Sequence, residues 1–188
     1  MTSYCEMAPG HEFHGPYHDH EYGVPVTDEA ILFERLVLEI NQAGLSWLTI
    51  LNKRAGFQKA YEGFVVDKVA AYDDAHRTRL LHDASIIRNR LKIDATMHNA
   101  RIVQGFRDRY GGFYAWLMYH HPMRKPEWVK LFKKTFRFTG GEITGEFLMS
   151  TGFLPGAHDV TCAVGKAITG APWQELGSVW FDDKGDGV

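Results

Sequence analysis

The chain has 188 residues, of which 45% are hydrophobic and 13% aromatic, and its formal net charge is -2. A chain of this length can form one well-buried core or two small lobes. No apolar run is long enough to span a bilayer, and the start, MTSYCEMAPG, lacks the basic and apolar regions of a signal peptide. We therefore expect a cytoplasmic protein with no membrane partner, in which the two cysteines do not form a disulfide.

Basic side chains are concentrated in the middle of the chain. Residues 1 to 30 contain no Lys or Arg, whereas one basic group runs from Arg77 to Arg109 and a second from Arg124 to Arg137. A nearly neutral protein can present a positive face to phosphates in this way. Ordinary solvated helix faces produce the same pattern, so the charge alone does not decide between the two.

The stretch from residue 27 to residue 47 predicts a central helix. Its apolar residues recur three and four positions apart and form one stripe, made of Leu32, Phe33, Leu36, Val37 and Ile40. Asp28 and Glu29 open the helix, where the positive end of the helix dipole favours anions. Gly44 closes it.

Glu39 is a charged residue within this apolar stripe. It lies seven residues after Leu32 and three after Leu36, so it points with the stripe and not towards water. A carboxylate that is buried without a partner costs roughly several kcal/mol and therefore needs a partner or a cavity. Two interpretations stay open: a Glu at the edge of the stripe that reaches water or an Arg, and a carboxylate that lines an apolar pocket and faces a polar ligand.

Short helices with short connections account for the rest of the chain. Residues 1 to 26 are rich in His, Gly, Pro and Tyr without a helical period, so we expect a loop-rich segment there. Helices are predicted over residues 46–56, 57–64, 67–72, 74–83, 89–110, 113–120, 127–136, 143–151 and 158–168, and the end of the chain is expected to fray. No strand pattern or internal repeat is present, so the predicted fold class is all-α.

His158 and Cys162 are a candidate pair of metal ligands. Four residues apart on a predicted helix, their side chains leave the same face one turn apart. The N-terminal segment offers Cys5 and His18 to complete a tetrahedral site that suits zinc, and four protein ligands make such a zinc structural. Rival ligands in the same segment are His11, His14 and His20. Separate buried thiols and core histidines are the alternative.

The run DASIIRNRLKI (83–93) places a turn between two predicted helices, and Arg88, Arg90 and Lys92 come just after that turn. In a helix-hairpin-helix, backbone N–H groups at such a turn bind a DNA phosphate and nearby basic side chains add charge. An ordinary helix corner with solvated arginines explains the same residues.

Four aromatic or soft side chains are candidates for a pocket around Glu39. Tyr17, Tyr22 and Met7 lie in the N-terminal segment, and Trp47 follows the central helix. Aromatics around a carboxylate can sandwich a flat base by stacking and cation–π attraction. Packing in the core is the other common fate of such residues.

Four runs of the sequence resemble the type I 3-methyladenine DNA glycosylases. They are YHDHEYGVPVTD (17–28), FERLVLEINQAGLSWLTILNKR (33–54), DASIIRNRLKI (83–93) and GFLPGAHDVTC (152–162), in the order found in that family. The resemblance implies a helix-hairpin-helix DNA glycosylase fold, with a second lobe formed by both termini and a structural zinc. It implies one glycosylase unit over residues 1–188, with a helical lobe at 28–115, the hairpin at about 74–110, and a zinc-stapled terminal lobe of 1–27 plus 116–188.

The resemblance also implies roles for individual residues. One zinc per chain would be bound by Cys5, His18, His158 and Cys162. Glu39 would contact the flipped base, in a pocket shaped by Tyr17 and Trp47 with Tyr22 and Met7 beside them. The turn that enters the space left in the duplex would hold Gly44 and Leu45. The hairpin contacts to DNA would come from Ser85, Arg88, Arg90 and Lys92.

The activity implied by the resemblance is base-excision repair. The enzyme would flip 3-methyladenine out of alkylated double-stranded DNA, hydrolyse its N-glycosidic bond and release the modified base. A 3-methylated adenine is cationic and a good leaving group, so the protein mainly has to extrude the base and hold it. No lysine is placed as a Schiff-base nucleophile, and we expect a monofunctional, monomeric enzyme.

The sequence departs from the family pattern at several positions. Glu6 and Met7 replace Gly-Trp, Tyr22 replaces a Trp, and Ser85 replaces a hairpin Gly. The usual Thr, Tyr and Gln of the C-terminal part are replaced by Glu142, Gly145 and Met149. A pocket with Met7 and Gly145 would be roomier, so a glycosylase for a bulkier alkylated purine is one alternative. A zinc-stapled binder of damaged DNA without catalysis is the other.

Overall fold

The computed structural model describes residues 2 to 176, and within that range the chain is helical without strands, as predicted. The α-helices are α1 (Tyr4–Met7), α2 (His14–His20), α3 (Glu29–Gln42), α4 (Trp47–Ala60), α5 (Val66–Ala70), α6 (Asp74–His82), α7 (Arg90–Tyr110), α8 (Phe113–His120), α9 (Lys125–Thr135), α10 (Gly141–Ser150) and α11 (Ala163–Ala167). Two 3-10 helices are η1 (Glu62–Phe64) and η2 (Pro172–Glu175).

Among the described residues, no helix is both long and apolar enough to cross a membrane. Residues 177–188, for which fraying is expected, lie outside the described part of the chain.

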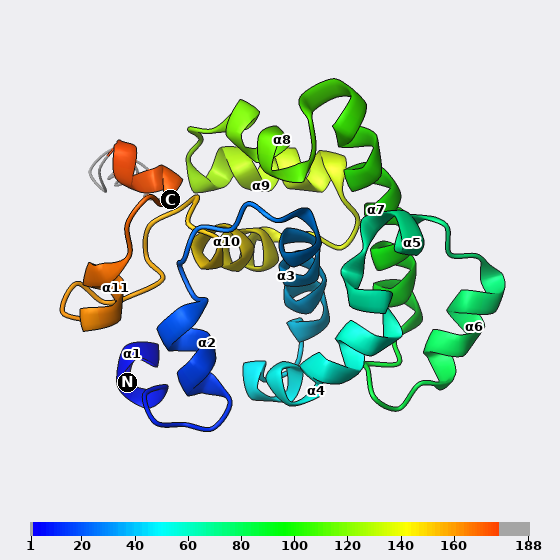
Figure 1. Cartoon of the computed structure of the whole chain (residues 1–188), viewed down its shortest axis with the longest axis horizontal. Helices are drawn as coiled ribbons and strands as arrows, with labels where there is room; N and C mark the ends of the chain where they lie inside the picture. The colour runs from blue at the N-terminus through cyan, green and yellow to red at the C-terminus, as the bar shows by residue number, and fades with distance from the viewer. Residues whose placement is uncertain (1, 177–188) are drawn as a thin grey trace, which may run out of the picture.

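Helix α3 lies at the centre of the molecule (Figure 1). Asp28 caps its start by accepting a hydrogen bond from the backbone N–H of Ile31 at 2.9 Å. Every residue from 32 to 41 is buried, because α3 contacts α4, α7, α8 and α10. An apolar stripe alone would bury one side of a helix, so the burial of the polar side chains on the other faces follows from these neighbours.

An aromatic core holds α10 against α8. Phe106 of α7 stacks on Trp116 of α8 with ring centroids 4.6 Å apart, and Phe113 stacks on Phe147 of α10 at 5.8 Å. These side chains are almost completely buried. Burial of apolar area and of stacked rings stabilises this layer. The position of α10 is functionally important, because this helix forms one wall of the cavity described below.

Three predicted elements are wrong. The N-terminal segment is not a loop but forms α1 and α2, and a capping box between Ser3 and Glu6 starts the first of these short helices. Helix α4 continues to Ala60, because Phe57 and Ala60 extend its buried face, so the predicted helix over 57–64 is divided between the end of α4 and the 3-10 helix η1. The last α-helix begins at Ala163, and residues 158–162 are turns that lead into it. Helices of four to seven residues are too short for a periodic pattern to reveal.

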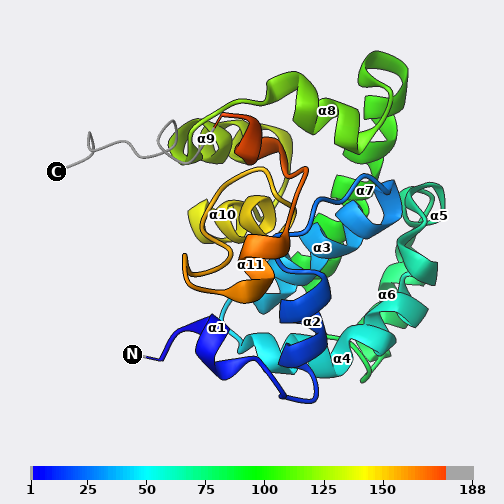
Figure 2. The same ribbon diagram turned by 60° about the vertical axis from the view of Figure 1, so that its left-hand side comes forward.

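The N-terminal helices lie against the segment that follows α10. Helices α1 and α2 lie beside α11 in both views (Figures 1 and 2). The Ser3 hydroxyl donates to a carboxylate oxygen of Asp159 at 2.5 Å, and the backbone N–H of Gly23 donates to the carbonyl of Ser150 at 2.9 Å. Residues near the start of the chain thus contact residues between 150 and 162. Their treatment as a separate lobe stays a prediction.

Candidate functional site

A cavity of about 750 Å³ lies against the C-terminal half of α3. It is bounded by the N-terminal helices, the loop from α3 to α4, the start of α4, and α10. Its aromatic wall consists of Tyr4, Tyr17, Tyr22 and Trp47. Its carboxylates are Glu39, Glu142 and Glu146, and no Lys, Arg or His among residues 2–176 lines it. The cavity therefore favours a flat ligand that is cationic or rich in donors.

The aromatic side chains pack against one another at the cavity. The ring centroids of Tyr17 and Trp47 are 5.1 Å apart, and those of Tyr17 and Tyr22 are 5.6 Å apart. Tyr4, which the sequence analysis did not single out, meets Tyr22 edge-on at 5.5 Å. The indole N–H of Trp47 is buried and has no acceptor within the described residues. Such a donor is satisfied when a ligand supplies an acceptor.

Glu39 lies in the wall of this cavity and is only 5% exposed. Within residues 2–176 its carboxylate makes neither a hydrogen bond nor an ion pair, so it is neither an edge residue nor one half of a structural pair. Burial raises the pKa of this carboxyl to about 8; the nearby charge of Glu146 adds to the rise and that of Arg35 opposes it. The sequence left two positions open for Glu39, the edge of the apolar stripe and the wall of a pocket, and in the structure Glu39 lies in the wall of a pocket. The role of Glu39 in ligand binding remains a prediction.

Arg35 fixes the aromatic wall from behind. This buried side chain donates through Nη1 to the hydroxyl of Tyr17 at 3.2 Å and through Nη2 to the carboxylate of Glu21 at 2.9 Å. Arg54 donates to the same Glu21 at 2.7 Å and to Glu34 at 2.8 Å. Each buried charge is thus paired and hydrogen-bonded, which offsets its desolvation. The network holds α2 against α3 and α4 and so positions Tyr17.

The loop from α3 to α4 bounds one side of the cavity, and the tip of this loop is exposed. Gly44 has a φ of 80°, which favours glycine, and Leu45 is 37% exposed. Lys92 lies on α7, which contacts α3. Its side chain is buried and donates to the carbonyls of Asn41 at 2.8 Å and Ala43 at 2.7 Å. These carbonyls end α3 and have no partner inside the helix. Lys92 therefore supports the loop from within, and it does not offer its charge to DNA as the sequence suggested.

Replacing Lys92 with Met is expected to lower the free energy of unfolding by about 2 kcal/mol, because it leaves the buried carbonyl of Asn41 and the half-buried carbonyl of Ala43 without this donor. The shape of the side chain is largely kept, so packing changes little. Chemical denaturation measures the effect, with Lys130→Met on an exposed face of α9 as the matched control. Equal stability of the two variants would contradict the supporting role.

Two pocket residues differ from the sequence prediction. Met7 is 44% exposed and is not part of the cavity wall, because α1 turns its side chain outwards. Glu146 was missed, although it lines the cavity and accepts a hydrogen bond from the Tyr22 hydroxyl at 3.1 Å. A signal was present, since Glu146 lies three residues after Ile143 on one helical face and directly before the buried Phe147.

The predicted hairpin connects α6 to α7. The backbone N–H and the hydroxyl of Ser85 donate to the carboxylate of Asp83 at 2.9 and 2.6 Å, and Lys53 of α4 donates to the carbonyl of Ala84 at 2.9 Å. Ser85, Arg88 and Arg90 are exposed. Helix α4 approaches closely here, since a Cβ at Gly56 would lie 2.4 Å from the carbonyl oxygen of Ser85. The turn is therefore held rigidly and presents its basic residues to solvent.

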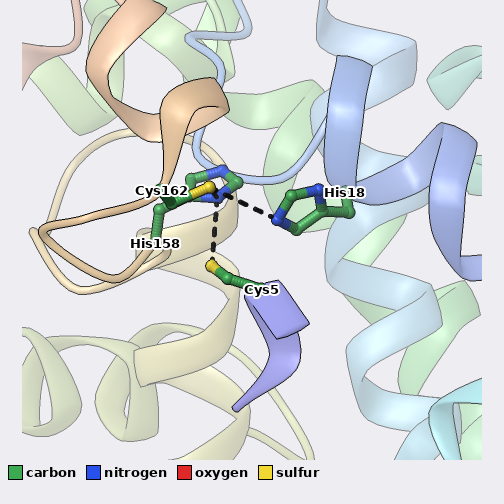
Figure 3. Close-up of side chains that lie close together, drawn as sticks. All are labelled: Cys5, His18, His158 and Cys162. Atoms are coloured by element: carbon green, nitrogen blue, oxygen red, sulfur yellow. Dashed lines mark hydrogen bonds between the residues drawn. The ribbon is translucent and has the colours of Figure 1, made fainter. Parts of the chain in front are cut away.

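Cys5, His18, His158 and Cys162 form one cluster, with their ligand atoms within 4.8 Å of one another. Figure 3 shows the four side chains pointing at a common centre. The nitrogen Nδ1 of His158 lies 3.6 Å from the sulfur of each cysteine, and Nε2 of His18 lies 3.7 Å from the sulfur of Cys162. These residues could bind a metal ion. The rival ligands His11, His14 and His20 do not belong to the cluster.

The cluster fits a tetrahedral zinc. Ordinary zinc–sulfur and zinc–nitrogen bonds place sulfur and nitrogen about 3.6 Å apart in a tetrahedron. The outer nitrogen of each histidine is also fixed: Nδ1 of His18 is 2.7 Å from the carboxylate of Asp19, and Nε2 of His158 is 2.7 Å from the carbonyl of Tyr22. Each partner holds the N–H away from the centre and leaves the other nitrogen free to ligate. A helix is not needed to pair His158 with Cys162, because the turns between them bring both side chains together.

The fold and the site together define an all-helical protein with a Cys/His cluster and a concave aromatic pocket, around a carboxylate that has no partner within residues 2–176. A sequence model of the methyladenine glycosylase family matches residues 8–129. The DNA-3-methyladenine glycosylase 1 of Escherichia coli (strain K12) is 35% identical over 165 residues, which cover 78% of this chain and 88% of that protein.

Two solved structures are similar over most of the chain. The 3-methyladenine DNA glycosylase I from Staphylococcus aureus gives a TM-score of 0.76 at 27% identity, over 87% of this chain and 96% of that chain. A 3-methyladenine DNA glycosylase I in complex with 3-methyladenine gives 0.77 at 28% identity, over 85% of this chain and 96% of that chain. The chain belongs to the methyladenine glycosylase family and is a glycosylase.

Proposed function

We propose that this chain is a base-excision-repair enzyme that hydrolyses the N-glycosidic bond of 3-methyladenine in alkylated double-stranded DNA. The observation that carries the proposal is the buried Glu39 carboxylate, which has no partner within the described residues and lines an aromatic cavity. A carboxylate in this state is satisfied by a cationic base with an exocyclic amine. The relative solved with 3-methyladenine supports the same ligand.

The base reaches the cavity by leaving the duplex. The exposed tip of the α3–α4 loop, Gly44 and Leu45, would fill the space that the flipped nucleotide leaves. Flipping costs about a few kcal/mol for unstacking and unpairing, and stacking on Tyr17 and Trp47 offsets that cost. No atom of the described residues lies within 4 Å of where a Cβ of Gly44 would be, so this side of the loop tip is open to a duplex.

The N-glycosidic bond breaks while the cavity holds the cationic base. The bond between C1′ of the sugar and the ring nitrogen breaks, and its electron pair moves onto the positively charged base, which leaves as neutral 3-methyladenine. The oxygen of a water molecule bonds to C1′ and its proton passes to solvent. Glu39 opposes the positive charge and accepts a hydrogen bond from the exocyclic amine. Among residues 2–176 no lysine lines the cavity, which supports a monofunctional enzyme without strand cleavage.

The hairpin is proposed to contact the DNA backbone through Ser85, Arg88 and Arg90. The double variant Arg88→Ala, Arg90→Ala is expected to reduce the slope of log Kd against log salt concentration by about 2, because each phosphate contact contributes about 0.9. Fluorescence anisotropy on a duplex with an abasic-site analogue measures this slope. An unchanged slope would place the DNA contacts elsewhere. Replacing Arg79, which donates to the carbonyl of Ala60, is the control for loss of an arginine.

We also propose that the Cys/His cluster binds one structural zinc per chain, that both termini form a lobe around it, and that the enzyme acts as a monomer. Four protein ligands leave no position for substrate, so the zinc would hold α1 and the 158–162 turns together. The carbonyl of Tyr22 accepts from His158, which links the cluster to the cavity wall.

Release of free base from methylated duplex DNA tests the function. We expect 3-methyladenine, identified by mass spectrometry, and an intact DNA strand until alkali cleaves the abasic site. Strand cleavage without alkali would contradict the monofunctional reaction. Tight binding of alkylated duplex without any base release would make the chain a binder of damaged DNA instead.

A further inference from the structure

Glu146 is a second cavity carboxylate to which the reaction above gives no part. It comes from α10, opposite Glu39 of α3, and both lie in the wall of the same cavity. The hydroxyl of Tyr22 donates to its Oε2 at 3.1 Å and so fixes its position. The two carboxylates thus face one ligand volume from two helices.

The two carboxylates influence each other's ionisation. The charge of Glu146 contributes to the raised pKa of Glu39, and burial raises the pKa of Glu146 itself. The hydrogen bond from Tyr22 and the charge of Lys125 oppose the rise at Glu146, whereas the charge of Glu142 adds to it. With no cation in the cavity wall among the described residues, such a pair retains a proton near neutral pH. One carboxyl then offers an O–H donor while the other remains an acceptor.

We propose that Glu146 is a second base-recognition carboxylate, and that the cavity selects purines by positive charge, so that it accepts cationic N-alkylated guanine such as 7-methylguanine as well as cationic alkylated adenine. This inference rests on the proposed glycosylase function and adds a class of substrate to it. The class is defined by the charge of the base and by the donors and acceptors along its edge.

The edge of an alkylated guanine matches the carboxyl pair. Its O6 is an acceptor, and its N1–H and exocyclic amine are donors. A single ionised carboxylate would repel O6, but a protonated carboxyl donates to it, and the second carboxylate accepts from N1–H. The buried indole N–H of Trp47, which lacks an acceptor within the described residues, is a further donor at the same cavity. On the side of the cavity that α10 forms, the wall begins with Gly140 and Gly141, and the small size of these residues leaves room for the larger base.

The test compares three bases in otherwise identical duplexes: 3-methyladenine, 7-methylguanine and hypoxanthine. Hypoxanthine has the same O6 and N1–H edge as guanine but no charge. We expect the wild-type chain to release both cationic bases and to leave hypoxanthine in place.

Glu146→Gln keeps the shape and an acceptor for Tyr22 but removes the charge. It should reduce both rates and lower the rate ratio of 7-methylguanine to 3-methyladenine release by about tenfold.

Two controls separate recognition from folding. Glu12→Gln makes the same chemical change at an exposed residue outside the cavity and should leave every rate unchanged. Tyr22→Phe leaves the carboxylate in place but removes its tether, and should shift the same rate ratio less than Glu146→Gln does. Thermal unfolding of each variant confirms that the comparison concerns folded protein.

Release of 3-methyladenine without 7-methylguanine by the wild type would overturn the proposed substrate class. An unchanged rate ratio in a folded Glu146→Gln variant would overturn the role of Glu146. Release of hypoxanthine at the rate of 7-methylguanine would overturn selection by charge. Each of these leaves the glycosylase function intact, whereas failure to release any base from any duplex would refute that function itself.

Discussion

Replacing Glu39 with Gln is expected to slow release of 3-methyladenine from methylated duplex DNA by about 100-fold or more, the usual effect of removing one electrostatic contact at a reacting centre. The variant keeps the volume of the side chain but loses the negative charge that opposes the cationic base. Single-turnover kinetics measure the rate of bond cleavage. A rate within about threefold of the wild type would remove Glu39 from the mechanism, because such a change is below 1 kcal/mol.

The pH dependence of the reaction provides a second readout for Glu39. Its pKa is raised to about 8 by burial and by the charge of Glu146. If the ionised form binds the cation, kcat/KM should rise with pH and level off above about 8, since this ratio reports the free enzyme. The Glu39→Gln variant should lack this rise. A wild-type profile that is flat between pH 6 and 9 would contradict the assignment, with the DNA substrate's own stability measured in parallel as the control.

The same substitution is expected to stabilise the protein. A carboxyl in the unfolded chain ionises near its ordinary pKa of 4.5, whereas in the folded chain it ionises near 8. The folded state therefore binds more protons between these values, and stability falls as pH rises through that window. At pH 7 the loss is on the order of 3 kcal/mol, and Glu39→Gln should recover it as an increase in Tm of about 5–10 °C. At pH 4, where both carboxyls are protonated, the gain should vanish.

Removal of the metal is expected to have the largest effect on stability. Stripping zinc with a chelator, or the substitution His158→Ala, should lower Tm by about 10 °C or more, because the ligands clip α1 and α2 to the turns after α10. Elemental analysis of the purified chain should give one zinc per chain. Differential scanning fluorimetry with and without added zinc measures the shift.

The histidine-rich N-terminal segment supplies a matched control for the zinc site. His20 is exposed and lies outside the cluster, so His20→Ala should retain both the zinc and the Tm. At a temperature where His158→Ala remains folded, its base-release rate should fall less than that of Glu39→Gln. Loss of base release with an unchanged Tm in His158→Ala would point to a catalytic ion and contradict the structural one.

Two of the residues that distinguish this chain from the family pattern, Tyr22 and Glu142, line the cavity. Tyr22 provides a hydroxyl where the pattern has an indole, and that hydroxyl holds Glu146. Gly145 leaves room for the end of the Lys125 side chain, since a Cβ there would lie 2.7 Å from Cε of Lys125. The departure at Tyr22 therefore supplies a hydroxyl that fixes a cavity carboxylate, and the proposed difference in substrate range depends on that carboxylate.

Local patterns in the sequence were enough to predict the long helices. Asp28, Ser46 and Asn89 are ordinary N-caps, and each begins its helix within one residue of the predicted start, because capping and periodicity are properties of neighbouring residues. The short helices α1 and α2 were missed for the opposite reason. They have too few residues for a period, and their contacts with distant parts of the chain hold them in place.

The sequence by itself determined that Glu39 lies on the buried face of a helix and that two cysteines and two histidines are available as metal ligands, because face and donor type depend only on residue order and chemistry. Only the tertiary structure decided what those residues meet. Burial of Lys92, the outward position of Met7 and the arrival of Glu146 opposite Glu39 depend on how α1, α7 and α10 pack against α3. Such packing joins residues far apart in the chain, and no local pattern encodes it.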